Sequence, residues 1–74
     1  MAEENKIPPD MVKQLRVLAH DLSNALEAIV QATYLLSQAK SPETTGRWVQ
    51  VIDQSSQDAV RLNQKLREIL RSQS

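Results

Sequence analysis

The sequence predicts an all-α fold, an antiparallel two-helix hairpin that dimerises into a four-helix bundle. Two long segments repeat their apolar residues at alternating spacings of four and three, the heptad pattern of packed helices. One short break containing Ser41 and Pro42 separates them, so the two helices are expected to run antiparallel. The 74 residues allow one domain, expected over residues 10–74 after a disordered leader over residues 1–9.

The first helix is predicted for about residues 10–39. Asp10 follows a Pro-Pro pair and suits the N-cap or the first turn, where a carboxylate favours the helix. The apolar seam that follows keeps its alternation over three and a half heptads: Met11, Leu15, Leu18, Leu22, Ala25, Ile29, Ala32 and Leu36.

The second helix is predicted for about residues 42–72, after a turn at about residues 40–42. Ser41 is a hydroxyl N-cap, Pro42 takes the first helical position, and Glu43 adds a carboxylate to the first turn. Its first seam residue, Trp48, is interpreted as a packing anchor at the closed end of the hairpin. The seam repeats the same alternation: Trp48, Ile52, Ser55, Ala59, Leu62, Leu66 and Ile69.

The apolar stripe on each helix is wider than one neighbouring helix covers. A second row lies beside the first seam, and further small or apolar residues lie beside the second seam. Two hairpins packed together would bury both stripes, which favours a homodimer over a monomer. The flanking residues are Val12, Ala19, Leu26 and Thr33 in the first helix and Val49, Ser56 and Leu70 in the second.

The composition excludes several classes of protein. Nine basic and nine acidic residues cancel, so there is no basic surface for nucleic acid or an anionic membrane. The chain has no cysteine, no apolar run long enough to cross a bilayer, and an acidic N-terminus unlike a signal peptide. We therefore expect a cytoplasmic protein that binds neither nucleic acid nor membrane.

The single histidine, His20, is followed at once by Asp21 and four residues later by Asn24. In the heptad frame His20 projects away from the seam, midway along the helix. A lone histidine is often an exposed side chain without a functional role, or a half-buried group. A metal site lacks further ligands, and a Ser-His-Asp triad needs a pocket that a hairpin does not form. Nucleophilic chemistry at an exposed imidazole, with Asp21 as acceptor for its N–H, remains open.

The run Leu-Ala-His-Asp-Leu-Ser-Asn-Ala-Leu, residues 18–26, resembles the H-box of the dimerisation and histidine-phosphotransfer domain of two-component sensor histidine kinases. In that family Glu or Asp follows the phospho-accepting histidine at once, and Asn or Thr lies four residues after it. The family fold is an antiparallel hairpin that dimerises into a four-helix bundle, and the resemblance covers about residues 10–72. Many members have Pro where this chain has Ala25.

The resemblance implies a role for each matching residue. His20 would accept the phosphoryl group, Asp21 would be its acid/base partner, and Asn24 would orient a water during dephosphorylation of the partner. The implied partners are a response-regulator receiver domain, a histidine kinase, or both. The receiver would dock toward the turn, on Glu27, Gln31 and Tyr34.

Arg61 is a candidate site residue because of the packing of the two helices, not because of the resemblance. In-register packing about the turn would bring Arg61 near the level of His20, where it could help bind phosphate. A solvated flank charge is the alternative for Arg61, as a solvated ring is for Tyr34.

The family's kinases bind ATP with glycine-rich motifs, whereas Gly46 is the only glycine here. We expect no autonomous kinase activity and no cofactor or metal on this chain; Mg²⁺ is expected only in the partner receiver domain.

Three functions stay open: a phosphorelay module exchanging a phosphoryl group between His20 and a receiver aspartate, a silent scaffold or decoy hairpin that binds a kinase or response regulator, and a generic helical dimerisation hairpin. The chain could be a stand-alone product, which Met1 favours, or an excised piece of a sensor kinase.

Overall fold

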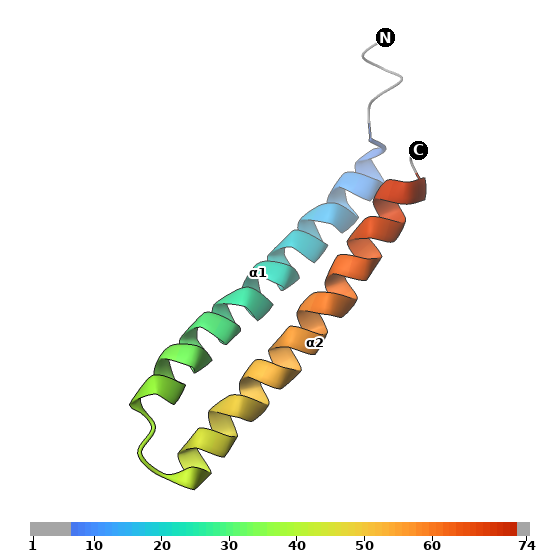
Figure 1. Ribbon diagram of the computed structural model, residues 1–74. Helices are drawn as coiled ribbons and strands as arrows, with labels where there is room; N and C mark the ends of the chain where they lie inside the picture. Colours follow the sequence, from blue (N-terminus) through green and yellow to red (C-terminus); the bar gives the residue numbers. More distant parts are fainter. Residues whose placement is uncertain (1–6, 73–74) are drawn as a thin grey trace.

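The computed structural model describes residues 7–72, which form two long helices. Helix α1 spans Pro9–Gln38 and helix α2 spans Pro42–Ser72. They lie side by side and run in opposite directions (Figure 1). The all-α antiparallel hairpin predicted from the heptads is therefore confirmed. Of the leader predicted for residues 1–9, residues 1–6 lie outside the described part, and Pro9 already belongs to α1.

Helix α1 begins without a side-chain cap. Pro8 is the N-cap, and its carbonyl oxygen accepts the N–H groups of Met11 at 2.9 Å and Val12 at 3.0 Å. Asp10 lies in the first turn, so the N-cap alternative for this residue is wrong and the first-turn alternative is right. Pro8 cannot supply a capping oxygen from its side chain, and the carboxylate of Asp10 instead faces the positive end of the helix dipole.

Helix α2 begins with the predicted serine cap. The Thr44 N–H donates to Ser41 Oγ at 3.1 Å, and the Ser41 hydroxyl also lies 2.8 Å from Thr44 Oγ1. The capping oxygen satisfies one of the backbone donors that a helix start leaves without a partner. Ser41 therefore fixes where the chain turns and where α2 begins.

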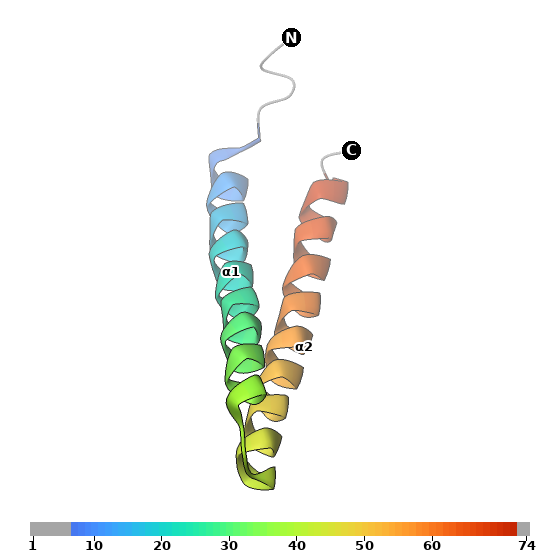
Figure 2. The same ribbon diagram turned by 60° about the vertical axis from the view of Figure 1, so that its left-hand side comes forward.

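The two seams are the least exposed rows of their helices. Ala25, Ala32 and Leu62 are buried, with Ala32 only 1% exposed, and the other seam residues are half-buried. The small seam residues, Ala25, Ala32, Ser55 and Ala59, all lie at the middle of the hairpin or nearer the turn, among larger ones such as Ile29 and Trp48. They let the helices approach closely there, because interhelical distance follows the size of the contacting side chains. Larger residues such as Met11 and Ile69 occupy the seams near the termini, where Figure 2 shows the helices drawing apart.

The hairpin has two different faces. One groove is lined by the residues that directly precede seam positions on both helices, so these share a side of the hairpin: Val17, Asp21, Asn24 and Ala28 of α1, and Asp58, Arg61 and Lys65 of α2. Residues that directly follow seam positions must lie on the other side. Five exposed aliphatic side chains occupy that second side, which we call the apolar face: Leu26, Val30, Val49, Val60 and Leu70.

The apolar face includes part of the second row that the sequence predicts. Leu26 of that row is 50% exposed in the single hairpin and Val30, one turn further on, is 69% exposed, so the other helix covers neither of them. The homodimer that would cover it stays a prediction. Within residues 7–72, neither helix has both the length and the apolar character needed to cross a membrane.

Candidate functional site

His20 lies midway along α1 with its side chain 72% exposed. The seam residues Leu18 and Leu22 lie two positions before and after it. Two positions correspond to about 200° of rotation on a helix, so His20 points away from α2. The geometry follows from the heptad spacing alone, and it leaves the imidazole accessible to another molecule.

Within residues 7–72, the imidazole makes one side-chain hydrogen bond, to the adjacent carboxylate. His20 Nδ1 lies 3.3 Å from Asp21 Oδ1, and the Asp21 side chain is 49% exposed. When Nδ1 carries the proton, it donates to Asp21 and leaves the lone pair on Nε2. This tautomer makes Nε2 a nucleophile that faces solvent.

Asp21 and Asn24 also line the groove on the side of the hairpin opposite the apolar face, together with Arg61 of α2. This part of the groove has a volume of about 530 Å³. The structure therefore brings three of the predicted site residues together and places Arg61 near the level of His20, as in-register packing requires. His20 itself lies outside the groove, on the outer surface of α1 beside Asp21.

The three residues predicted to dock a receiver lie elsewhere on α1. Glu27 and Tyr34 follow His20 at seven-residue intervals and share its outward side, and the Tyr34 side chain is 64% exposed. Gln31 follows Asn24 by seven residues and is also exposed. None of these three lines the groove with Asp21. Glu27 and Tyr34 lie on the outer surface of α1 with His20, whereas Gln31 directly precedes the seam residue Ala32 and lies on the groove side, nearer the turn.

Sequence reasoning missed the partner of Arg61. Asp58 Oδ1 accepts a hydrogen bond from Arg61 Nη2 at 3.1 Å and another from Gln54 Nε2 at 3.2 Å. Both Asp58 and Arg61 directly precede seam residues, and this offset is the signal that would have placed them on one side. The pair is half-exposed, so it orients Arg61 more than it stabilises the fold.

Sequence reasoning also missed the apolar neighbour of the histidine. Val17 lies three residues before His20, one turn along α1, and is 54% exposed. This aliphatic side chain is therefore available to a partner that reaches the imidazole.

The described residues contain no group of three or more His, Cys, Asp or Glu side chains that could hold a metal ion. No protein-family model, curated protein or solved structure matches this chain. The site is therefore interpreted from its own geometry and from the H-box resemblance.

Proposed function

We propose that this protein is a phosphorelay module that carries a phosphoryl group on His20. The observation that supports this proposal is the contact between His20 Nδ1 and Asp21 Oδ1 on an otherwise exposed imidazole. A rigid helix presents the ring, its acceptor is the next residue, and the second nitrogen faces solvent. Phosphoryl transfer requires chiefly positioning and charge stabilisation, which such a site can supply to a partner.

The proposed transfer begins with Nε2 of His20 attacking the phosphorus of a phosphorylated aspartate on a receiver domain. The N–P bond forms as the bond between phosphorus and the aspartate oxygen breaks, and the receiver carboxylate leaves with that electron pair. The ring gains positive charge, which the carboxylate of Asp21 stabilises before accepting the Nδ1 proton. The reverse reaction passes the phosphoryl group from His20 to the receiver, whose own Mg²⁺ would neutralise the phosphate charge.

Asn24 and Arg61 have supporting roles in this proposal. Asn24 lies one turn after His20 and presents a carboxamide at the groove rim, where it would orient a water for dephosphorylation of the receiver. Arg61 presents a guanidinium at the same level, where it would contact an anionic group of the docked partner. The receiver would extend toward the turn over Glu27, Gln31 and Tyr34.

The proposed active form is a homodimer in the cytoplasm. The five aliphatic residues of the apolar face support it, because they stay exposed to water in a single hairpin. Two copies joined through these faces would form a four-helix bundle. His20 points away from the seam, so it would stay accessible in that bundle.

Phosphorylation experiments test the proposal. The protein is incubated with a panel of histidine kinases and labelled ATP, and separately with phosphorylated receiver domains. We expect a label that is lost in acid and kept in base, as a phosphohistidine requires. The label should be absent from His20→Gln and acquired more slowly by Asp21→Asn, while Ser23→Ala, a neighbouring exposed change, should keep the normal rate.

Two results would contradict phosphotransfer. One is an absence of label with every partner, and the other is a label that persists in His20→Gln. If the protein nevertheless binds a kinase or receiver domain, the scaffold or decoy function becomes the better account, since the apolar face supports dimerisation without requiring any chemistry. Circular dichroism of His20→Gln establishes that the loss of label is not a loss of helix.

A further inference from the structure

The apolar face includes a second heptad row along α2, which we call the α2 row. Each of its residues directly follows a seam residue, so the row repeats the spacings of four and three about 100° around the helix from the seam. A helix with two such rows suits a bundle in which it packs against two neighbours. Ser56 is half-buried and the rest of the row is exposed, so the hairpin itself supplies only one neighbour. The α2 row is Val49, Asp53, Ser56, Val60, Asn63, Arg67 and Leu70.

The α2 row is complementary to its own reverse. Counted outward from Val60 in both directions, it matches two apolar residues, two residues of opposite charge and two small polar residues. The matching residues are Val49 with Leu70, Asp53 with Arg67, and Ser56 with Asn63. The members of each pair are equally far from Val60 to within one residue, which is about 1.5 Å of helix. A two-fold axis at Val60 would therefore bring the α2 helices of two copies together antiparallel, with each residue against its match, as an isologous interface requires.

The charged residues of the apolar face are separated along the hairpin. Three charged side chains directly follow seam residues: Arg16 on α1, and Asp53 and Arg67 on α2. The seam residues Leu18 and Leu62 line the same part of the groove and lie beside each other. Counted from these two residues, Arg16 and Arg67 lie within one helical turn of the same level, toward the open end, whereas Asp53 lies toward the turn.

This separation distinguishes the two directions in which two apolar faces can meet. If both turns lay at the same end, α1 of each copy would lie over α2 of the other. Arg16 would then lie close to Arg67 of the second copy, and Asp53 would lie between Leu26 and Val30. If the turns lay at opposite ends, α1 would lie over α1 and α2 over α2, with both arginines at the level of Asp53 of the second copy. The antiparallel direction replaces contacts between like charges with contacts between opposite charges.

The corresponding row of α1 fits the same two-fold axis. Val60 lies two residues before Leu62, so the axis crosses α1 close to Asp21. Val12 and Val30 lie equally far from Asp21 on its two sides, so each would meet the other's counterpart in the second copy. The nearer matches are Ala19 with Ser23 and Arg16 with Leu26. Small side chains therefore lie at the axis, where two helices can approach closely, and the aliphatic part of an arginine covers a leucine.

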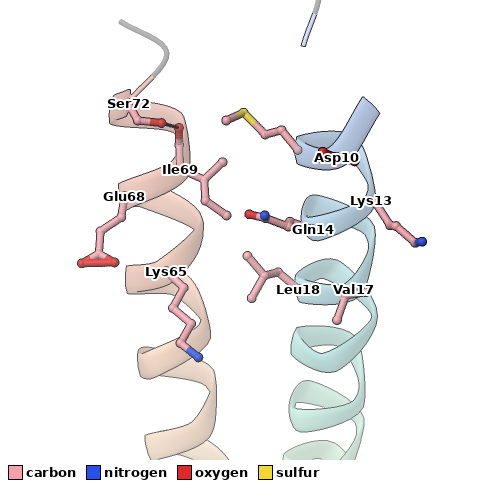
Figure 3. Close-up of a pocket in the computed structure, with 10 residues that line it drawn as sticks. Asp10, Lys13, Gln14, Val17, Leu18, Lys65, Glu68, Ile69 and Ser72 are labelled. Carbon is pink, nitrogen blue, oxygen red and sulfur yellow. Dashed lines mark hydrogen bonds between the residues drawn. The ribbon is translucent and has the colours of Figure 1, made fainter. Parts of the chain in front are cut away.

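We propose that this protein forms an antiparallel homodimer through its apolar faces, with Val60 at the two-fold axis. The inference rests on the homodimer of the proposed function and adds its direction. The groove on the opposite side gives no comparable selection of an occupant. At its open end (Figure 3) it is lined by residues of both charges on both helices, Asp10 and Lys13 on α1 and Lys65 and Glu68 on α2.

The antiparallel direction determines where the two histidines lie. His20 is close to the level of Val60 and points away from α2. Because α1 lies over α1, both histidines emerge on the same side of the bundle, on helices whose axes are about 8–10 Å apart. A dimer with both turns at one end would instead place them on opposite sides. If His20 acts as proposed, a receiver docked at one histidine obstructs the other, and each dimer binds one receiver at a time.

Cysteine cross-linking tests the direction, since the chain has no cysteine of its own. Val60→Cys should form an intermolecular disulfide under mild oxidation, because the two Cα atoms at the axis lie within disulfide range. Gln64→Cys, one turn further along on the outer side of α2, should not. Leu70→Cys should cross-link when mixed with Val49→Cys. Cross-linking of Leu70→Cys to Val12→Cys instead would mean that both turns lie at one end, and it would overturn the proposal.

A distance between the two turns gives an independent measurement. Lys40 lies between α1 and α2, twenty residues before Val60. Spin labels on Lys40→Cys should therefore be about 60 Å apart in the antiparallel dimer, measured by double electron–electron resonance. A distance below about 30 Å would show the turns at the same end and would overturn the proposal.

Charge reversal tests the pairing of Asp53 with Arg67. Asp53→Lys and Arg67→Asp should each weaken the dimer about tenfold by sedimentation equilibrium, and the double variant should recover most of the affinity. Glu68→Lys makes the same charge change as Asp53→Lys on the groove side and should have little effect. A double variant as weak as the single variants would contradict the pairing.

The outcomes separate this inference from the proposals on which it rests. A monomer at every concentration up to about 500 µM would overturn both the homodimer and its direction. A dimer with both turns at one end would overturn only the direction. None of these measurements uses phosphorylation, so the phosphotransfer proposal is decided by its own experiment.

Discussion

Replacing Gly46 with alanine should stabilise this protein. Gly46 lies inside α2 without a positive φ, and a Cβ built there meets no atom within 4 Å. The substitution therefore changes helix propensity without adding or removing a contact. Glycine costs about 0.8–1.0 kcal/mol relative to alanine in a helix interior, and somewhat less near the helix start, so we expect a gain of about 0.5–1 kcal/mol. For a domain of this size the gain raises Tm by about 2–8 °C.

Thermal unfolding followed by circular dichroism measures this gain, and Gly46→Ser should give about half of it because serine has intermediate propensity. An unchanged Tm at every protein concentration would refute the propensity reasoning. Gly46 also lies one turn before Val49 of the apolar face. If Gly46→Ala is stabilising in dilute protein but destabilising at high concentration, the added methyl obstructs a close approach between two copies at this point.

Three further predictions concern the cap, the core and the apolar face. Ser41→Ala removes the oxygen that accepts the Thr44 N–H, so it should cost about 1 kcal/mol and lower Tm by about 4–8 °C; an unchanged Tm would mean that water replaces the cap. Leu62→Ala truncates the largest of the buried side chains and should lower the free energy of unfolding in urea by about 2–3 kcal/mol. Leu26 is half-exposed, so Leu26→Ala should lower it by less than about 0.5 kcal/mol in dilute protein. Equal losses for the two variants would contradict the described core. Val30→Glu should weaken the homodimer at least tenfold by sedimentation equilibrium, and Val17→Glu, comparably exposed on the groove side, should leave it unchanged; the reverse pattern would move the interface to the groove.

The arrangement of the hairpin was predictable because the heptad spacing determines direction as well as burial. Once Leu18 and Leu22 occupy the seam, His20 must point outward, and it does. The same spacing fixes which residues precede seam positions and therefore share the groove side. The Ser41 cap was equally predictable, because its hydroxyl and the following Pro42 each suit one helix-start position.

The separation of the helices and the partner of Arg61 were not predictable from spacing. Separation depends on how side chains of different size fill the seam: the part from the middle of the hairpin to the turn mixes small residues with large ones such as Trp48, whereas the part toward the termini has only large ones such as Met11 and Ile69. The bond from Arg61 to Asp58 depends on which rotamer two exposed side chains adopt, since each could instead be solvated. The sequence allowed either Asp10 or a residue before it to be the N-cap of α1, and the position of Asp10 in the first turn follows from Pro8 being the N-cap.

Asp21 connects the proposed phospho-acceptor site with the groove. Its carboxylate contacts the imidazole of His20 and also lines the groove. A basic side chain of a partner docked beside Asp21 would compete with His20 Nδ1 for the same carboxylate oxygens. Withdrawing that acceptor leaves the ring without the group that stabilises its positive charge during transfer, so such a partner should slow phosphorylation of His20. In Asp21→Asn the carboxylate is already absent, and the same partner should then leave the remaining transfer rate unchanged.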